Sequence, residues 1–143
     1  MRYSPKKCYQ EGYKYKMELI TILHDGLQNA LWLFFLLIGL WGTYIAVKGG
    51  GIDGSWIGAF FISTGMVIIQ TVLTILLWWN GQMTDLQDPG IHFLYLAFAV
   101  LFPPFIYQVV LKGDDSNRGM WVMAFTTLFM FGIAIRLVNT GLS

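Results

Sequence analysis

Hydrophobic and polar positions alternate along this chain in long blocks, not in the short periods of a soluble helix or strand. Four apolar runs cover residues 19–47, 56–79, 91–111 and 119–137, and a bilayer crossing takes about 20 residues. The polar stretches between the runs are short, so neighbouring helices should run antiparallel. The pattern predicts an all-α fold, an integral membrane four-helix bundle with up-down-up-down order, in which Ser55 caps the second helix.

Composition supports a membrane protein and argues against a nucleic-acid partner. Apolar residues make up 56% of the chain and charged residues 12%, whereas soluble proteins average about 25% charged residues. The net charge is only +1, so we expect membrane lipid, and no nucleic acid, around the protein. Cys8 is the single cysteine, which excludes an intrachain disulfide and any paired-cysteine metal or c-type haem motif.

The first sixteen residues differ from the rest of the chain. They contain five of its nine basic residues and no apolar stretch, so they do not form a signal peptide. We expect residues 1–16 to be either a basic cytoplasmic tail or the product of a start codon assigned too early. Residues 17–143 are then one transmembrane domain.

The charges of the loops predict the orientation of the bundle. Loops one and three carry Lys48, Lys112 and Arg118, whereas loop two carries only Asp85 and Asp88. By the positive-inside rule loops one and three are cytoplasmic if translation starts after the basic tail, and a genuine tail argues for the reverse. We expect the first arrangement, in a prokaryotic plasma membrane, with the entrances of helices one and three at the outer face.

The two histidines of the chain, His24 and His92, lie at the entrances of the first and third runs. These two entrances open on the same side of an up-down bundle. His24 lies 24 residues, or about 36 Å of helix, before Lys48, and His92 lies 20 residues, or about 30 Å, before Lys112. Both imidazoles should therefore lie at similar depth.

Metal-ligating residues inside a membrane are rare and usually functional. His24 and His92, on facing helices, could be the two iron ligands of one low-spin b-type haem per chain. The alternative is that each imidazole only hydrogen-bonds lipid headgroups or caps a helix.

Four further residues are candidates for the surroundings of such a haem. Gln28 and Ala99 lie on the same helix faces as the two histidines. Gln70, in the middle of the second run, either bonds a neighbouring helix or contacts a porphyrin or quinone edge. Arg136 lies about 26 Å along its helix from residue 119, where it either pairs with a haem propionate or extends its charge to the membrane surface.

Three stretches of the chain resemble haem A synthases: residues 67–73 around Gln70, residues 91–99 around His92 and residues 132–143 with Arg136. That family packs two four-helix halves, and the resemblance implies one such half with a cyclically shifted helix order. It implies a haem pair of His24 and His92 with Arg136 nearby. Thr21 stands where the family has a catalytic glutamate, so haem A synthesis and a catalytic residue are not implied.

Together these features predict a membrane b-type cytochrome with one bis-histidine haem, a metal-binding electron-transport subunit more than a complete enzyme. We expect it to transfer electrons in or beside a respiratory complex, with membrane quinone as a candidate partner. A homodimer is the other expected assembly, and Gly58, Gly65 and the Phe60–Phe61 pair offer packing residues for either. The alternative function is a haem-free accessory or assembly subunit of a respiratory complex.

Overall fold

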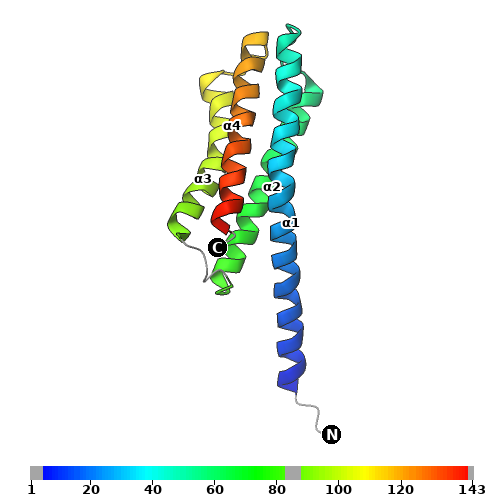
Figure 1. Cartoon of the computed structure of the whole chain (residues 1–143), viewed down its shortest axis with the longest axis vertical. Helices are drawn as coiled ribbons and strands as arrows, with labels where there is room; N and C mark the ends of the chain where they lie inside the picture. The colour runs from blue at the N-terminus through cyan, green and yellow to red at the C-terminus, as the bar shows by residue number, and fades with distance from the viewer. Residues whose placement is uncertain (1–4, 83–87, 142–143) are drawn as a thin grey trace.

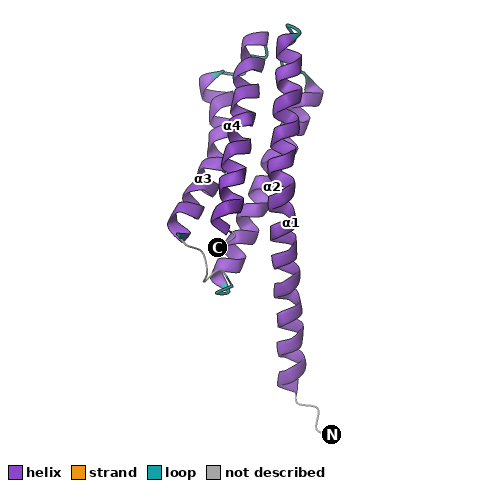
Figure 2. Ribbon diagram, in the orientation of Figure 1, coloured by secondary structure: helices purple, strands orange, loops and turns teal. Residues whose placement is uncertain are grey.

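The computed structural model describes residues 5–82 and 88–141, and these ranges contain four α-helices and one short π-helix. Each α-helix is long and apolar enough to cross a membrane, and the third such span consists of α3 and the π-helix η1 together (Figures 1 and 2). The expected all-α membrane bundle is thus confirmed. The elements are α1 (Pro5–Val47), α2 (Gly54–Trp79), α3 (Pro89–Phe105), η1 (Ile106–Val110) and α4 (Asn117–Gly141).

The helices form a bundle in which α1 and α3 lie diagonally opposite each other. Helix α1 packs most extensively against α4 and next against α2, whereas α3 makes fewer contacts with α2 and α4. Among the described residues, no Cα atoms of α1 and α3 approach within 8 Å, and the same holds for α2 and α4. Side chains that point inward from α1 and α3 therefore face each other across the bundle axis.

Helix α1 begins well before the first apolar run. It has 43 residues, or about 65 Å of helix, and its N-terminal part extends past the other helices (Figure 1). The hydroxyl of Tyr13 donates to Asn80 Oδ1 at the end of α2, at 2.8 Å. Residues 5–16 are therefore a continuous part of α1, and the apolar pattern did not predict this because their side chains from Cys8 onward are exposed.

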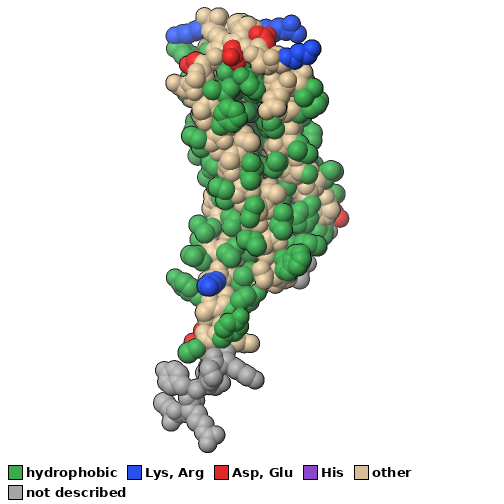
Figure 3. Space-filling model, turned by 180° about the vertical axis from the view of Figure 1, so that it is seen from behind, with side chains coloured by type: hydrophobic (Ala, Val, Ile, Leu, Met, Phe, Trp, Pro, Cys, Tyr) green, Lys and Arg blue, Asp and Glu red, His purple; other side chains and the backbone are tan. Residues whose placement is uncertain are grey.

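At the opposite end, the α1–α2 loop and the start of α4 are bonded together. The Asn117 side-chain amide donates to the carbonyls of Ala46 and Gly50, both at 2.8 Å. Charged side chains gather at this end, above a broad hydrophobic belt (Figure 3). Hydrogen bonds from Ser116 lower the pKa of the Asp114 carboxyl from its ordinary value.

The expectation that Ser55 caps the second helix was wrong. Helix α2 begins at Gly54, and Asp53 is its N-cap. The Asp53 carboxylate accepts a hydrogen bond of 2.7 Å from the Trp56 amide. A carboxylate is a strong acceptor there and is also favoured by the positive end of the helix dipole, so Ser55 falls in the first helical turn.

Two apolar clusters fill the bundle. One lies towards the histidines and centres on Leu31, Phe35 and Leu96. The other lies towards the opposite end, around the fully buried Trp56. The Trp56 ring stacks on the Phe60 ring, and their centroids are 5.6 Å apart. Phe60 is therefore a core residue, and of the expected Phe60–Phe61 packing pair only Phe61 faces outward, with 60% exposure.

Pro103 and Pro104 do not end the third span. Helix α3 contains both prolines and continues into η1, where the Leu111 amide donates to the Ile106 carbonyl five residues earlier, at 2.9 Å. Prolines lack an amide donor and disturb the ordinary α-helical ladder. In the wider π-turn that follows, each backbone amide donates to the carbonyl five residues earlier in the chain.

Candidate functional site

His24 and His92 are both buried, with 3% and 1% exposure. They lie on the diagonally opposite helices α1 and α3. His24 contacts Thr74 of α2, and His92 lines a cavity with Gln70, which is one turn before Thr74. The two imidazoles therefore lie at the same end of the bundle and at similar depth.

Both ring nitrogens of His24 have protein partners. Nδ1 lies 3.1 Å from Asp25 Oδ1, and Nε2 lies 3.1 Å from the Thr74 hydroxyl. An ionised carboxylate can only accept, so Nδ1 carries the proton in the bond to Asp25. The Thr74 hydroxyl also lies 2.9 Å from the carbonyl of Gln70 in its own helix.

The His92 ring is bonded on one side only. Nδ1 lies 3.0 Å from the hydroxyl oxygen of Thr140, which also lies 3.0 Å from the carbonyl of Arg136. If the hydroxyl proton goes to that carbonyl, Nδ1–H donates to the Thr140 oxygen and Nε2 keeps its lone pair. Within the part of the chain that the structure describes, Nε2 has no hydrogen-bond partner.

His92 Nε2 is one of three buried polar atoms without a partner, and their residues share one cavity. The other two are Gln28 Nε2 and Gln70 Oε1, again counted over the described residues. The cavity has a volume of about 10 Å³, which is room for no more than about one water molecule. An unpaired buried polar group costs about 1–3 kcal/mol, so this convergence of three helices is unusual for a purely structural core.

Two other candidates lie outside this cavity. Ala99 is buried in the adjoining apolar cluster and lines a second small cavity together with Gln70. Arg136 is exposed, one turn before Thr140 on α4. The single ion-pair contact among the described residues joins His24 to Asp25, so Arg136 pairs with no carboxylate there. The structure thus brings together His24, His92, Gln28 and Gln70, with Ala99 beside them and Arg136 on the outer surface.

Thr74, Thr140 and Asp25 are the residues of the site that sequence reasoning missed. The Thr74 hydroxyl bonds the Gln70 carbonyl of its own helix and also reaches His24 Nε2. A usable signal existed for Thr74, since it follows Gln70 by four residues and so shares its helix face. No signal marked the pairing of Thr140 with His92, because the two residues are 48 positions apart.

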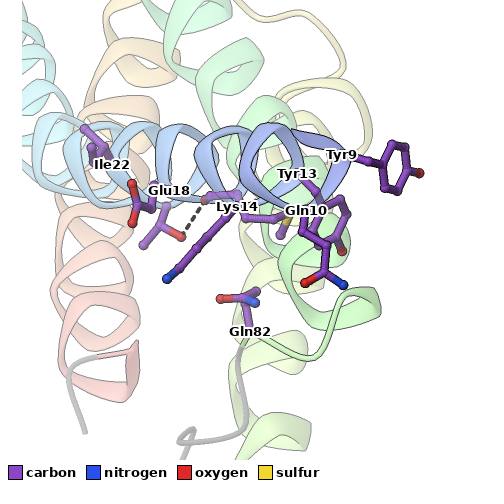
Figure 4. Close-up of a pocket in the computed structure, with 9 residues that line it drawn as sticks. Tyr9, Gln10, Tyr13, Lys14, Glu18, Ile22 and Gln82 are labelled. Carbon is purple, nitrogen blue, oxygen red and sulfur yellow. Dashed lines mark hydrogen bonds between the residues drawn. The ribbon is translucent and has the colours of Figure 1, made fainter. Parts of the chain in front are cut away.

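A larger groove lies beside the N-terminal part of α1 (Figure 4). Its volume is about 770 Å³, and all of its lining residues except Met17 are exposed. No histidine lines it, and an open groove of exposed side chains offers little exclusion of water. The lining residues are Tyr9, Gln10, Tyr13, Lys14, Met17, Glu18, Thr21, Ile22 and Gln82.

The available ligands restrict the kind of metal centre. In residues 5–82 and 88–141, no three His, Cys, Asp or Glu side chains cluster closely enough to hold a metal ion. Two histidines can hold only a metal that brings its other ligands with it, as the iron of a haem does. In this arrangement of the helices the cavity beside His92, at about 10 Å³, has no room for such a group.

Comparisons with family models, with curated proteins and with solved structures find no match for this chain.

Proposed function

We propose that the protein is a membrane b-type cytochrome that holds one haem through His24 and His92 and transfers electrons in or beside a respiratory complex. The observation that carries this proposal is the pair of buried imidazoles on diagonal helices at one end of the bundle. Burying such groups in a membrane interior is expensive and usually marks a functional site.

The hydrogen bonds around the imidazoles suit this role. Metal-ligating histidines almost always donate their second ring N–H to a carboxylate, carbonyl or water, which fixes the tautomer and the ring orientation. Asp25 offers such a carboxylate to Nδ1 of His24, and the Thr140 hydroxyl lies at the corresponding place beside Nδ1 of His92. When bound, the haem supplies one-electron iron chemistry, and two imidazole ligands give a low-spin site.

The remaining residues of the site would shape its surroundings. Gln28 and Gln70 present unpaired amide atoms to polar groups at this level of the bundle. Leu31, Phe35 and Leu96 form a dry apolar layer beneath them, which would limit the access of water and so influence the redox potential.

Haem binding would require the helices to separate at this end. Side chains fill the space between the two imidazoles, apart from the cavity of about 10 Å³. Helix α3 makes fewer contacts with its neighbours than α1 does, so a displacement of α3 is the least costly way to open the site.

Three further features support the wider proposal. The motifs around Gln70, His92 and Arg136 are similar to haem A synthases, which bind haem in four-helix bundles. Thr21 replaces the catalytic glutamate of that family, which favours electron transfer over haem modification. The charges of the loops favour a haem near the outer face of a prokaryotic plasma membrane, where membrane quinone is the candidate electron donor.

The test is a reduced-minus-oxidised optical spectrum of the protein purified in mild detergent. We expect a low-spin b-type spectrum with one haem per chain. His24→Ala and His92→Ala should each abolish the low-spin form, whereas Gln108→Ala, at an exposed position of η1, should leave it unchanged. A variant that lacks both histidines and keeps the same spectrum would contradict the proposal.

The second candidate is a haem-free accessory or assembly subunit of a respiratory complex. It is favoured by the close packing of the site and by the protein partners on both nitrogens of His24. In that case wild-type protein made in a haem-producing host would be folded and helical but would lack the spectrum.

A further inference from the structure

Three buried polar atoms converge on the cavity beside His92, and each comes from a different helix. Gln28 Nε2 belongs to α1, Gln70 Oε1 to α2 and His92 Nε2 to α3. None of them has a hydrogen-bond partner within residues 5–82 and 88–141, and no residue of the three is more than 8% exposed. The other residues that line the cavity are apolar. These three atoms can therefore be satisfied only by a molecule that enters the cavity between them.

The chemistry of the two amides restricts that molecule to a neutral one. The Gln28 amide nitrogen donates, so it repels a cation, whereas the Gln70 carbonyl oxygen accepts and so repels an anion. A molecule that contacts both must accept one hydrogen bond and donate another. The cavity volume of about 10 Å³ admits about one water molecule and nothing larger.

His92 can bond a water molecule in either neutral tautomer. If Nδ1–H donates to the Thr140 oxygen, Nε2 accepts, and if the Thr140 hydroxyl donates to Nδ1, Nε2–H donates. Water donates two hydrogen bonds and accepts two, so it satisfies Gln28, Gln70 and His92 in both cases. Ammonia has a similar size but accepts only one bond, so it fits only the first case. Three polar partners are also the usual number for a buried water.

We infer that this cavity binds one water molecule, which joins Gln28 of α1, Gln70 of α2 and His92 of α3. The inference does not depend on the proposed haem, because it concerns the helices as they pack here. Among the described residues, the side-chain hydrogen bond of α3 goes from His92 to Thr140 of α4, and none joins α3 directly to α1 or α2. The water is then the polar link between α3 and these two helices.

The first measurement detects the water at Gln28. Protein from a haem-deficient host, labelled with ¹⁵N-glutamine, is studied by NMR in deuterated detergent and ordinary water, and Gln28→Met assigns the Gln28 amide. We expect a nuclear Overhauser effect between the Gln28 side-chain amide protons and a long-lived water. The exposed Gln108 amide is the reference that shows no long-lived water. A Gln28 amide that contacts Gln70 directly and shows no water would overturn the inference.

The second measurement fills the cavity. Ala134 of α4 is buried and lines it, so Ala134→Val adds two carbon atoms in the space of the water. We expect the Overhauser effect at Gln28 to be lost. In protein labelled with ¹⁵N-histidine, the His92 Nε2 signal should move to that of an unbonded nitrogen. The His24 signals should not change, because both of its ring nitrogens have protein partners.

Ala124→Val is the matched control. Ala124 is also buried on α4 but lies outside both small cavities, so its substitution should leave the Gln28 and His92 signals at their wild-type values. If Ala134→Val does not fold, Gln70→Met is the second variant. It removes one partner of the water and should weaken the Overhauser effect at Gln28. An Overhauser effect that is unchanged in either folded variant overturns the inference.

Discussion

Gly42 on α1 and Trp56 on α2 touch so closely that a side chain at position 42 would collide with the indole. A Cβ atom at this position would lie 2.9 Å from Trp56 Nε1 and 2.8 Å from the terminal methyl of Met120. The same indole is fully buried and donates to the carbonyl of Ile38 at 3.1 Å. Glycine thus allows α1, α2 and α4 to converge at the end of the bundle opposite the histidines.

We predict that Gly42→Ala destabilises the protein by about 1–3 kcal/mol, because a methyl group must be inserted into a filled core. Gly132→Ala is the control, since its Cβ would meet nothing within 4 Å and alanine favours the helix. Denaturation in detergent, followed by circular dichroism, measures both. Equal stabilities of the two variants would contradict the packing role of Gly42.

Arg136 should influence a bound haem through its charge. It lies one turn before Thr140 on α4 and is exposed, so a propionate at the membrane surface could reach it. We predict that Arg136→Leu weakens haem retention and lowers the midpoint potential, because a nearby cation favours the reduced iron. One partly solvated charge is worth about 1–2 kcal/mol. Redox titration of the purified protein measures the shift.

Arg118→Leu is the matched control for this prediction. It removes the same charge at the opposite end of the bundle, in the first turns of α4. The potential and haem content of the Arg118 variant should stay at wild-type values. If the Arg136 variant also keeps the wild-type potential and haem content, the wild-type guanidinium only places its charge at the membrane surface and does not act on the haem.

The orientation of the bundle can be tested with single cysteines in a Cys8→Ser background. Ser55 and Gln82 are exposed and lie at opposite ends of α2. Loop two itself falls largely in residues 83–87, outside the described residues. With loops one and three cytoplasmic, Ser55→Cys should react with an impermeant thiol reagent only after permeabilisation, and Gln82→Cys before it. The reverse labelling would place the histidines on the cytoplasmic side.

The outward face of α2 is the expected surface for association. Cβ atoms at Gly58 and Gly65 would meet nothing within 4 Å, and Phe61 is exposed beside them. Small residues on such a face allow close helix packing in membranes. We predict a mass above one protomer in native mass spectrometry from mild detergent, either as a homodimer or within a larger assembly.

The double substitution Gly58→Leu and Gly65→Leu should lower this mass to that of a monomer, because bulky side chains keep a partner helix at a distance. The helical content should not change, since both positions face open space within the protomer. A double variant that associates as the wild-type protein does would exclude this face.

Much of the site could be predicted from the sequence, but its hydrogen bonds could not. His24, His92, Gln28 and Gln70 converge because equal depths follow from helix rise and alternating direction. The partners Thr74 and Thr140 depend on the rotation of each helix about its own axis. Apolar residues occur on every side of a lipid-facing helix, so periodicity does not fix that rotation. Phe60 is an example, because its sequence context does not show that it points inward, whereas its stacking on Trp56 in the structure does.

The sequence alone determined the class of protein, the number of spans and the end of the bundle at which the histidines lie. Long apolar runs and short polar links suffice for this, because the bilayer requires helices of a set length. Only the tertiary structure decided that His24 is held by Thr74 while His92 faces a cavity. That difference arises from hydrogen bonds between residues 50 and 48 positions apart, which depend on how the four helices pack.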